Sequence, residues 1–398
     1  MPLPAIRALV PMLCLMVLAA CSPGRTVEAV DLLTDLADPP PLPEALAAVE
    51  RQEIAGPADL YRATDVAPEA ALVVVPGAAE EGRRDPRLVR FAATLADAGF
   101  LVLVPGLAGD DPLRLSAGDA DAVARGVQRL TGTAAVAEVG LVGISYAAGP
   151  ALLAALRPAV REHVGFVLVI GGYHDITAAI TYMTTGAYRV APGAGWRTGP
   201  VDRQAKWRFL LANAGRVGAG TDDAETLRAI ARRRLAAPGA GVAALTQALG
   251  PEARAVWRLL SNDDPDRVPA LIDALPDALR TEIRALDLSR RDLDRLTAEV
   301  ILIHGRDDPM VPWTESRALA ERIGPDQARL YVVDGLYHVD MGDLSAGDGL
   351  ALLRAAYRLL KARDEAPAPS APAPARSVTS AGRTRRRGGL PRRSRCRA

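Results

Sequence analysis

The segment Val139-Gly140-Leu141-Val142-Gly143-Ile144-Ser145-Tyr146-Ala147 gives the clearest indication of the fold of this 398-residue chain. Its first four residues form a short apolar run, and the segment that begins at Ala147 is rich in alanine and leucine, as a helix is. A serine between a strand and a helix lies in a tight turn, where small residues at 143 and 147 let the two elements approach. An ordinary tight turn in a chain rich in glycine and alanine is the alternative interpretation.

The same alternation of a short apolar run and a helical segment recurs along the chain. This order predicts an α/β fold, with a mostly parallel central sheet and helices on both faces. The expected strands are residues 71–75, 100–104, 139–142, 164–170, 299–303 and 329–333, with 51–54 and 60–63 as antiparallel edge strands. The expected helices between them are 86–98, 119–130, 147–156, 315–323 and 349–361.

One connection between strands is much longer than the others. Roughly 125 residues separate the strand that ends at 170 from the strand that begins at 299, which is too long for a loop. Segments with helical periodicity fill it, namely 224–235, 242–249, 252–260, 268–275 and 277–285. Ser289-x-x-Asp292 has the form of a capping box and predicts one more helix. We therefore expect a helical cap, residues 173–298, inserted between two core strands.

Three further segments match the chemistry that a nucleophilic serine needs. Residues 73–78 run from an apolar strand into Pro-Gly-Ala. A Gly-x-x-Asp step that ends at Asp308 follows the strand at 299–303, and His338 follows the last strand. Serine, aspartate and histidine therefore occur along the chain in the order that the triad of α/β-hydrolases has.

Residues 49–363 thus resemble the α/β-hydrolase superfamily, with core parts at 49–172 and 299–363. The resemblance implies that Ser145 is the nucleophile, Asp308 the acid and His338 the general base. The backbone N–H groups of Ala78 and Tyr146 would form the oxyanion hole. The implied function is a serine hydrolase that cleaves a carboxylic ester of a small acyl substrate through an acyl-enzyme, with no cofactor and no metal.

Two departures from the family pattern leave other interpretations open. Ala147 stands where the last glycine of G-x-S-x-G is usual, and no histidine precedes Gly77. The alternative is a non-catalytic, hydrolase-like envelope lipoprotein that serves as a binding or scaffold protein. Acyl transfer to an acceptor other than water is a third reading, which the sequence does not separate from hydrolysis.

Other ionisable residues near these motifs have competing roles. Asp307 directly precedes the predicted acid, and Asp175 follows the strand at 164–170, where some family members carry the acid. We expect His304 and His174 to be structural. We expect His163, in a polar turn, to be solvated.

The N-terminus resembles the signal peptide of a bacterial lipoprotein. Residues 8–20 are apolar, follow Arg7, and are too short to span a membrane. Leu18-Ala19-Ala20-Cys21 resembles a lipobox, which implies removal of residues 1–20, acylation of Cys21, and a lipid anchor in the bacterial cell envelope on its periplasmic or extracytoplasmic face. An ordinary secretory signal is the alternative. Residues 21–48, with three prolines at 39–41, are expected to form a tether.

Charge is distributed unevenly. The chain has 48 Lys+Arg and 47 Asp+Glu residues and a net charge of +1, but nine arginines and no acid follow residue 375. The rest of the chain therefore carries −8, which disfavours nucleic acid as a partner. Residues 364–398, rich in Pro, Ala and Arg, are expected to be a disordered tail, with contact to an anionic surface as the functional alternative. The three cysteines lie at 14, 21 and 396, so the body has no cysteine-based zinc site.

Overall fold

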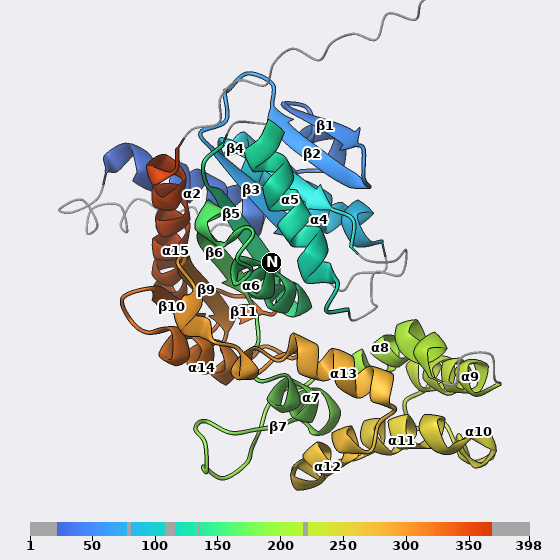
Figure 1. Ribbon diagram of the computed structural model, residues 1–398. Helices are drawn as coiled ribbons and strands as arrows, with labels where there is room; N and C mark the ends of the chain where they lie inside the picture. Colours follow the sequence, from blue (N-terminus) through green and yellow to red (C-terminus); the bar gives the residue numbers. More distant parts are fainter. Residues whose placement is uncertain (1–21, 78–80, 108–115, 134–135, 218–221, 368–398) are drawn as a thin grey trace, which may run out of the picture.

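A central sheet organises the structure, a computed structural model that describes residues 22–77, 81–107, 116–133, 136–217 and 222–367 (Figure 1). Eight strands lie in the order β1-β2-β4-β3-β5-β6-β9-β10. Their bounds are β1 Val49–Ile54, β2 Ala58–Ala63, β3 Ala70–Val75, β4 Phe100–Pro105, β5 Val139–Ile144, β6 Val164–Ile170, β9 Glu299–Gly305 and β10 Ala328–Val333.

The pairing of these strands confirms the predicted α/β fold. β2 pairs antiparallel with β1 and with β4, and the other pairs in the sheet are parallel. Every residue of β3 and of β4 is buried, whereas β1 at the edge buries only Val49. Parallel strands that are covered on both faces have continuous apolar runs, which is why the sequence pattern located them.

Helices cover both faces of the sheet, and each face has its own hydrophobic cluster. Three helices pack on one face: α5 (Asp119–Thr133), α6 (Ala148–Ala155) and α14 (Thr314–Ile323). Three pack on the other: α2 (Pro23–Ala37), α4 (Pro86–Asp97) and α15 (Ala346–Glu365). Across the described residues, no helix combines the length and the apolar character that a membrane crossing needs.

The first described segment is a helix, which corrects the prediction of a tether at 21–48. Helix α2 lies against α15 (Figure 1) and buries Ala29 and Leu32. The Ser22 N–H donates to the Tyr357 hydroxyl at 3.0 Å. The prolines at 39–41 follow the helix and do not interrupt it. The apolar residues at 29, 32, 33 and 36 have helical spacing, which the tether interpretation leaves unexplained.

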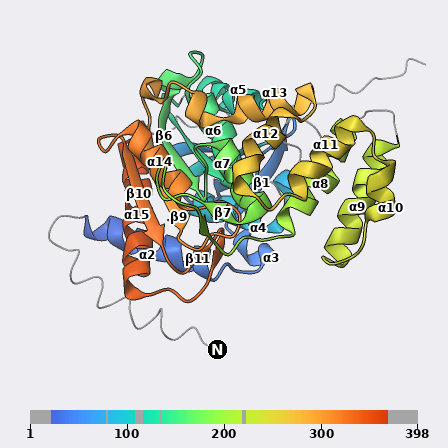
Figure 2. The same ribbon diagram turned by 90° about the horizontal axis from the view of Figure 1, so that it is seen from below.

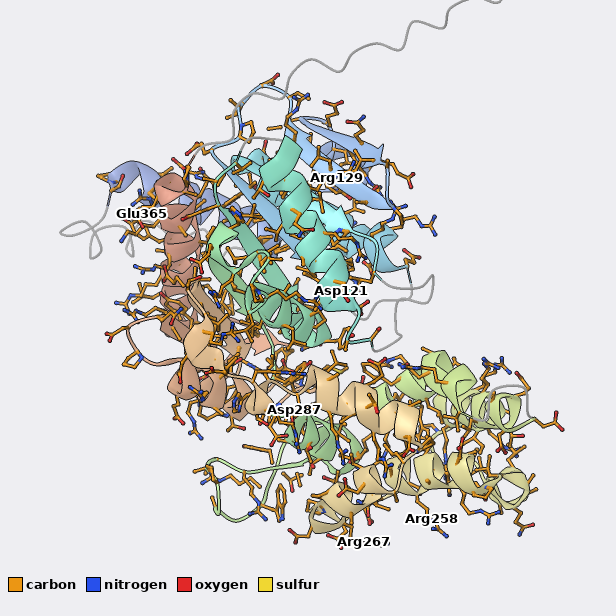
Figure 3. The ribbon with its side chains drawn as sticks, viewed as in Figure 1. Asp121, Arg129, Arg258, Arg267, Asp287 and Glu365 are labelled. Carbon is orange, nitrogen blue, oxygen red and sulfur yellow. The ribbon has the colours of Figure 1, made fainter. Side chains whose placement is uncertain are left out.

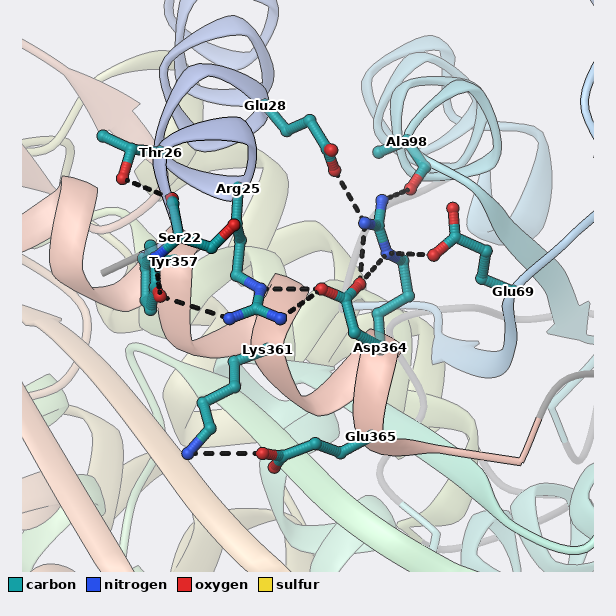
Figure 4. Close-up of polar contacts among 11 residues, drawn as sticks. Ser22, Arg25, Thr26, Glu28, Glu69, Ala98, Tyr357, Lys361, Asp364 and Glu365 are labelled. Carbon is teal, nitrogen blue, oxygen red and sulfur yellow. Dashed lines mark hydrogen bonds and ion pairs between the residues drawn. The ribbon is translucent and has the colours of Figure 1, made fainter. Parts of the chain in front are cut away.

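An arginine near the end of α15 joins three segments at this contact. The Arg363 guanidinium pairs with Glu28 of α2 at 2.6 Å and donates to the carbonyl of Ala98, after α4, at 2.7 Å (Figure 4). Arg25 of α2 in turn donates to Asp364 at 2.7 Å. Helix α15 therefore continues to Glu365, past the predicted end of the core at 363, and the expected tail from 368 on lies outside the described residues.

A group of helices lies between β6 and β9 in the chain and at one end of the sheet in space (Figure 1). Figure 2, from below, places α9 and α10 at its outer edge. The helices are α7 Ile176–Thr185, α8 Ala205–Asn213, α9 Asp223–Ala236, α10 Ala243–Ala248, α11 Pro251–Leu260, α12 Val268–Asp273 and α13 Asp277–Leu286. They share a cluster of buried residues in which Trp207 stacks on Trp257 at 5.9 Å. We call residues 173–298 the helical insertion.

Two details of the helical insertion differ from the sequence prediction. Helices α7 and α8 were not expected, and a short hairpin of Ala187–Tyr188 and Arg197–Thr198 separates them. Ser289-x-x-Asp292 starts no α-helix, and only 3-10 turns form there. The reason is that the Ser289 hydroxyl donates to Asp287 at 2.7 Å, so this side chain does not cap a following helix.

Candidate active site

Ser145 has the backbone conformation of a nucleophile in a tight turn. It follows β5 and opens a 3-10 turn that leads into α6, and its φ is 57°. Among the described residues, only Ser145 and His338, at 64°, have a positive φ without being glycine. A left-handed conformation costs such residues about 1–2 kcal/mol and is typical of functional sites. The two strained positions are the predicted nucleophile and the predicted base.

Glycines make the close packing around this turn possible. A Cβ on Gly143 would lie 2.7 Å from the carbonyl oxygen of Ala147, and one on Gly149 would overlap the hydroxyl of Tyr173. The close contact between Gly149 and Tyr173 explains why alanine can stand at 147, where the G-x-S-x-G pattern has its last glycine. The close approach that requires glycine falls two residues later, where Tyr173 reaches α6, while Ala147 itself is fully buried.

The structure describes one of the two residues predicted to form the oxyanion hole. The Tyr146 side chain is buried, and its hydroxyl donates to Asp119 at 2.9 Å and accepts from the Ser116 N–H at 2.8 Å. Burial and the Asp119 charge raise the pKa of Tyr146, so the phenol stays neutral. These contacts fix the residue that follows the nucleophile. Ala78, the other predicted donor, lies outside the described residues.

Asp308 and His338 meet beyond the ends of β9 and β10. Nδ1 of His338 donates to Oδ2 of Asp308 at 2.8 Å. Oδ1 of Asp308 accepts from the backbone N–H groups of Met310 at 2.7 Å and Val311 at 3.0 Å, and the side chain is buried. The bond between His338 and Asp308 leaves Nε2 of His338 as the basic nitrogen.

The charge state of Asp308 follows from its neighbours. Burial alone would raise the pKa of Asp308, but His304 and His338 outweigh burial and hold that pKa below its ordinary range. The carboxylate is therefore ionised at neutral pH. Gly171 leaves the space for this pair, since a Cβ there would lie 3.1 Å from both Asp308 Oδ2 and His338 Nδ1.

The competing residues have other partners. Asp175 caps α7 by accepting from the Thr177 N–H at 2.7 Å, and Asp307 is exposed. His304 is fully buried, with its ring nitrogens 2.7 Å from the Ser316 hydroxyl and 3.0 Å from the Val311 carbonyl. His163 is exposed, as expected. The structure thus brings Asp308 to His338, while Asp175 caps α7 and Asp307 is exposed.

Ser145 opens into a cavity of about 200 Å³ between the core and the helical insertion. Met310 and Val311 line it from the core side. Apolar side chains of α7, α8, α11 and α13 line most of the rest, among them Ile180, Phe209, Leu260, Leu279 and Ile283. Such a space suits an apolar group of a substrate. No group of three or more metal-binding side chains occurs among the described residues.

A buried carboxyl group joins the helical insertion to the core, and the sequence analysis did not identify it. Glu315 of α14 accepts from the backbone N–H groups of Asp175 at 2.7 Å and His174 at 3.1 Å. Burial raises the pKa of Glu315 to about 7, although these N–H groups lower it. Asp287, at the other end of the helical insertion, lies where the two parts meet (Figure 3). No sequence pattern marks Glu315, because its partners are backbone atoms distant in the chain.

Comparison with known proteins gives similarity at the level of solved structures. No family model matches the chain, and no curated protein does. A serine hydrolase from the polyaromatic hydrocarbon-degrading bacterium Cycloclasticus zankles is 14% identical, with 79% of this chain and 97% of that chain covered and a TM-score of 0.42. A protein of Legionella pneumophila described as a hydrolase is 12% identical, with 80% and 88% covered and a TM-score of 0.49.

A meta-cleavage product hydrolase from Pseudomonas fluorescens is a third similar structure. It is 19% identical, with 78% of this chain and 95% of that chain covered and a TM-score of 0.38. At identities this low, the activity must be argued from the residues of this chain.

Proposed function

We propose that this chain is a serine hydrolase that cleaves carboxylic esters through an acyl-enzyme on Ser145. The pair of strained residues carries the proposal, because Ser145 and His338 have a left-handed backbone that only a specific requirement explains. The bond between His338 and Asp308 supports it, as does the position of Ser145 at the cavity. A protein that only binds a ligand has no need of these three features together.

The proposal implies the following sequence of steps. Nε2 of His338 takes the proton of the Ser145 hydroxyl while Oγ attacks the carbonyl carbon of the ester, since a neutral hydroxyl is a weak nucleophile. Asp308 holds the imidazole and stabilises its charged form. The imidazolium then gives the proton to the departing alkoxide. A water molecule repeats the attack on the acyl-enzyme, and the acid is released.

Backbone N–H groups would stabilise the negative charge that forms on the carbonyl oxygen. In this proposal they belong to Tyr146 and Ala78, and loss of one such donor costs about 3 kcal/mol of transition-state stabilisation. The helical insertion acts as the cap. Its apolar wall excludes water from the acyl group and selects among acyl groups by shape.

A lipid anchor at Cys21 is part of the same proposal. The lipobox-like sequence supports it, and the ordered helix α2 starts only two residues later. Mass spectrometry of the mature protein should show an acylated N-terminal Cys21, and Cys21→Ser should release the protein from membranes with its esterase activity intact. An unacylated mature protein would disprove the anchor and leave the hydrolase proposal standing.

Labelling with a fluorophosphonate tests the hydrolase proposal directly. The probe should modify Ser145, as peptide mapping would show, and the Ser145→Ala protein should resist it. The unlabelled protein should hydrolyse members of an ester panel, and this activity should be lost once the probe has modified Ser145. A folded protein that neither reacts with the probe nor hydrolyses any ester would favour the scaffold alternative.

A further inference from the structure

The cavity next to Ser145 contains one charge that no carboxylate balances. Its charged lining residues are Lys206, Arg216 and Glu282. Arg216 and Glu282 pair at 3.1 Å, so their charges cancel. Within the described part of the chain, Lys206 forms no ion pair, and its Nζ donates to the carbonyl of Thr184 at 2.9 Å. The net charge of the lining is therefore positive at Lys206.

The hydrogen bond to Thr184 offsets only part of the free-energy cost of placing the charge of Lys206 in the cavity. Thr184 lies in the last turn of α7, where a cation is favourable. A carbonyl uses one of the three N–H groups of an ammonium and supplies no counter-charge. Even partial burial of a cation beside apolar side chains is costly unless the cation is paired, and the Trp207 ring, whose centroid lies 5.5 Å from Nζ, supplies only part of the compensation. An anion in the cavity would complete this site.

The surroundings of Lys206 add positive charge. Burial, together with Arg203 before α8 and Arg234 on α9, lowers the pKa of Lys206 to about 8, while the exposed Asp263 acts in the opposite direction. Among the described residues, Nε of Arg234 is buried and has no hydrogen-bond partner, although Nη1 donates to the carbonyl of Pro238 at 2.6 Å. The surroundings of Lys206 thus attract an anion, whereas most of the remaining lining of the cavity is apolar.

We propose that the cavity accepts an amphipathic acyl group, apolar along its length and ending in a carboxylate that pairs with Lys206. The inference rests on the proposed function, because the acyl carbon must lie at Ser145. The substrate class is the half-ester of an aliphatic dicarboxylic acid. Hydrolysis breaks the acyl C–O bond, and water supplies the new hydroxyl and the proton of the alcohol. The new carboxylic acid gives its proton to solvent, and a dicarboxylate leaves.

The test compares matched substrates that differ in the terminal charge. Nitrophenyl half-esters of hexanedioic to dodecanedioic acid are measured against nitrophenyl esters of the monocarboxylic acids of equal length. The wild-type protein should prefer one half-ester over its neutral partner by about tenfold or more in kcat/KM, the effect of one ion pair in an apolar site. This preference should decline as the pH rises through about 8, where Lys206 loses its proton.

Variants of the two lysines in the chain provide the control. Lys206→Met should reverse the preference, and Lys206→Arg should restore part of it. Lys361→Met should not change it, because Lys361 lies on α15 and pairs with the exposed Glu365 at 3.3 Å. The ratio of two substrates is measured in one sample, so partial unfolding of a variant does not affect it.

Two results would overturn the inference and are distinct from failure of the proposed function. Hydrolysis of neutral esters with no preference for any half-ester would exclude a carboxylate site and leave the serine hydrolase intact. If no ester is hydrolysed, calorimetry with octanedioate and octanoate decides the point independently. Octanedioate should bind more tightly to the wild-type protein than to Lys206→Met, and equal binding would end the proposal.

Discussion

The end of the sheet and the helical insertion differ in how they fix their side chains. At the sheet, backbone geometry dominates, because Ser145 has a strained φ and Asp308 accepts from two backbone N–H groups and from His338. In the helical insertion, apolar side chains define the cavity. A change at the sheet should therefore alter the rates for all substrates, whereas a change in the helical insertion should alter the ratio between the rates for different substrates.

Loss of the nucleophile or of the base should have the largest effect. Ser145→Ala and His338→Ala should each lower kcat/KM by roughly 10⁶-fold for long and short esters alike, and the double variant should be little worse, since such residues act as a unit. Steady-state kinetics on the ester panel checks this. His163→Ala, an exposed histidine, is the control. Losses that multiply in the double variant would show that the two residues act separately.

Loss of the acid should lower the rate less than loss of Ser145 or His338 does. Asp308→Asn should lower kcat by about 10⁴-fold, because the amide favours the wrong tautomer of His338 while the nucleophile remains. Asp307→Asn is the matched control and should have little effect. If Asp175→Asn gave the large loss while Asp308→Asn stayed active, the assignment of the acid would be wrong and the hydrolase would survive.

Glu315, which joins the helical insertion to the core, should make the free energy of unfolding depend on pH. The pKa of Glu315 is raised to about 7 in the folded protein, so the folded state binds more protons than the unfolded state between its ordinary pKa of 4.5 and about 7. The stabilising contribution is complete below that ordinary pKa and is lost as the pH rises through about 7. The free energy of unfolding should thus fall by about 3 kcal/mol over this range.

Urea denaturation at several pH values measures the effect of Glu315. Glu315→Gln should flatten the dependence, because an amide does not titrate. Glu321→Gln is the control on the same helix, where the carboxyl is exposed. Identical pH profiles for the wild-type and Glu315→Gln proteins would refute the buried proton.

Filling the cavity should have the smallest effect on the reaction and the clearest effect on selectivity. Ala179→Trp on α7 places a large ring where Ala179 lines the cavity. The ratio of kcat/KM for long esters to that for acetyl esters should fall by about tenfold, the scale of a few contacts with a hydrophobic pocket. Ala178→Trp, the neighbouring residue outside the lining, is the control. An unchanged ratio would place the acyl group elsewhere.

The sheet could be predicted from the sequence because its strands are covered on both faces. β3, β5 and β6 are six or seven residues long and contain only apolar residues and glycine, a pattern that few other elements allow. The pairing of Asp308 with His338 also followed from their positions after strands. The sequence allowed a strained φ to be expected at Ser145, which lies in a tight turn between a strand and a helix. It did not allow one to be expected at His338, because no sequence pattern marks that residue.

The helical insertion was harder to predict because its helices depend on tertiary contacts. Helix α7 is rich in threonine, which has low helix propensity. It forms because Asp175 caps it and because threonine hydroxyls donate to carbonyls one turn back, as Thr181 does to Thr177 at 2.8 Å. Lys206 could have been noticed as one of two lysines in the chain, but its place in an apolar cavity required the structure.

The packing of α2 on α15 has a consequence for orientation. Under the proposed anchor, only Ser22 separates Cys21 from the first turn of α2, and Arg363 joins α2 to the core through Glu28. So short a connection would leave the core little reach, and its height above the lipid would be set by one helix. An enzyme attached in this way would sample substrates in a thin layer near the membrane.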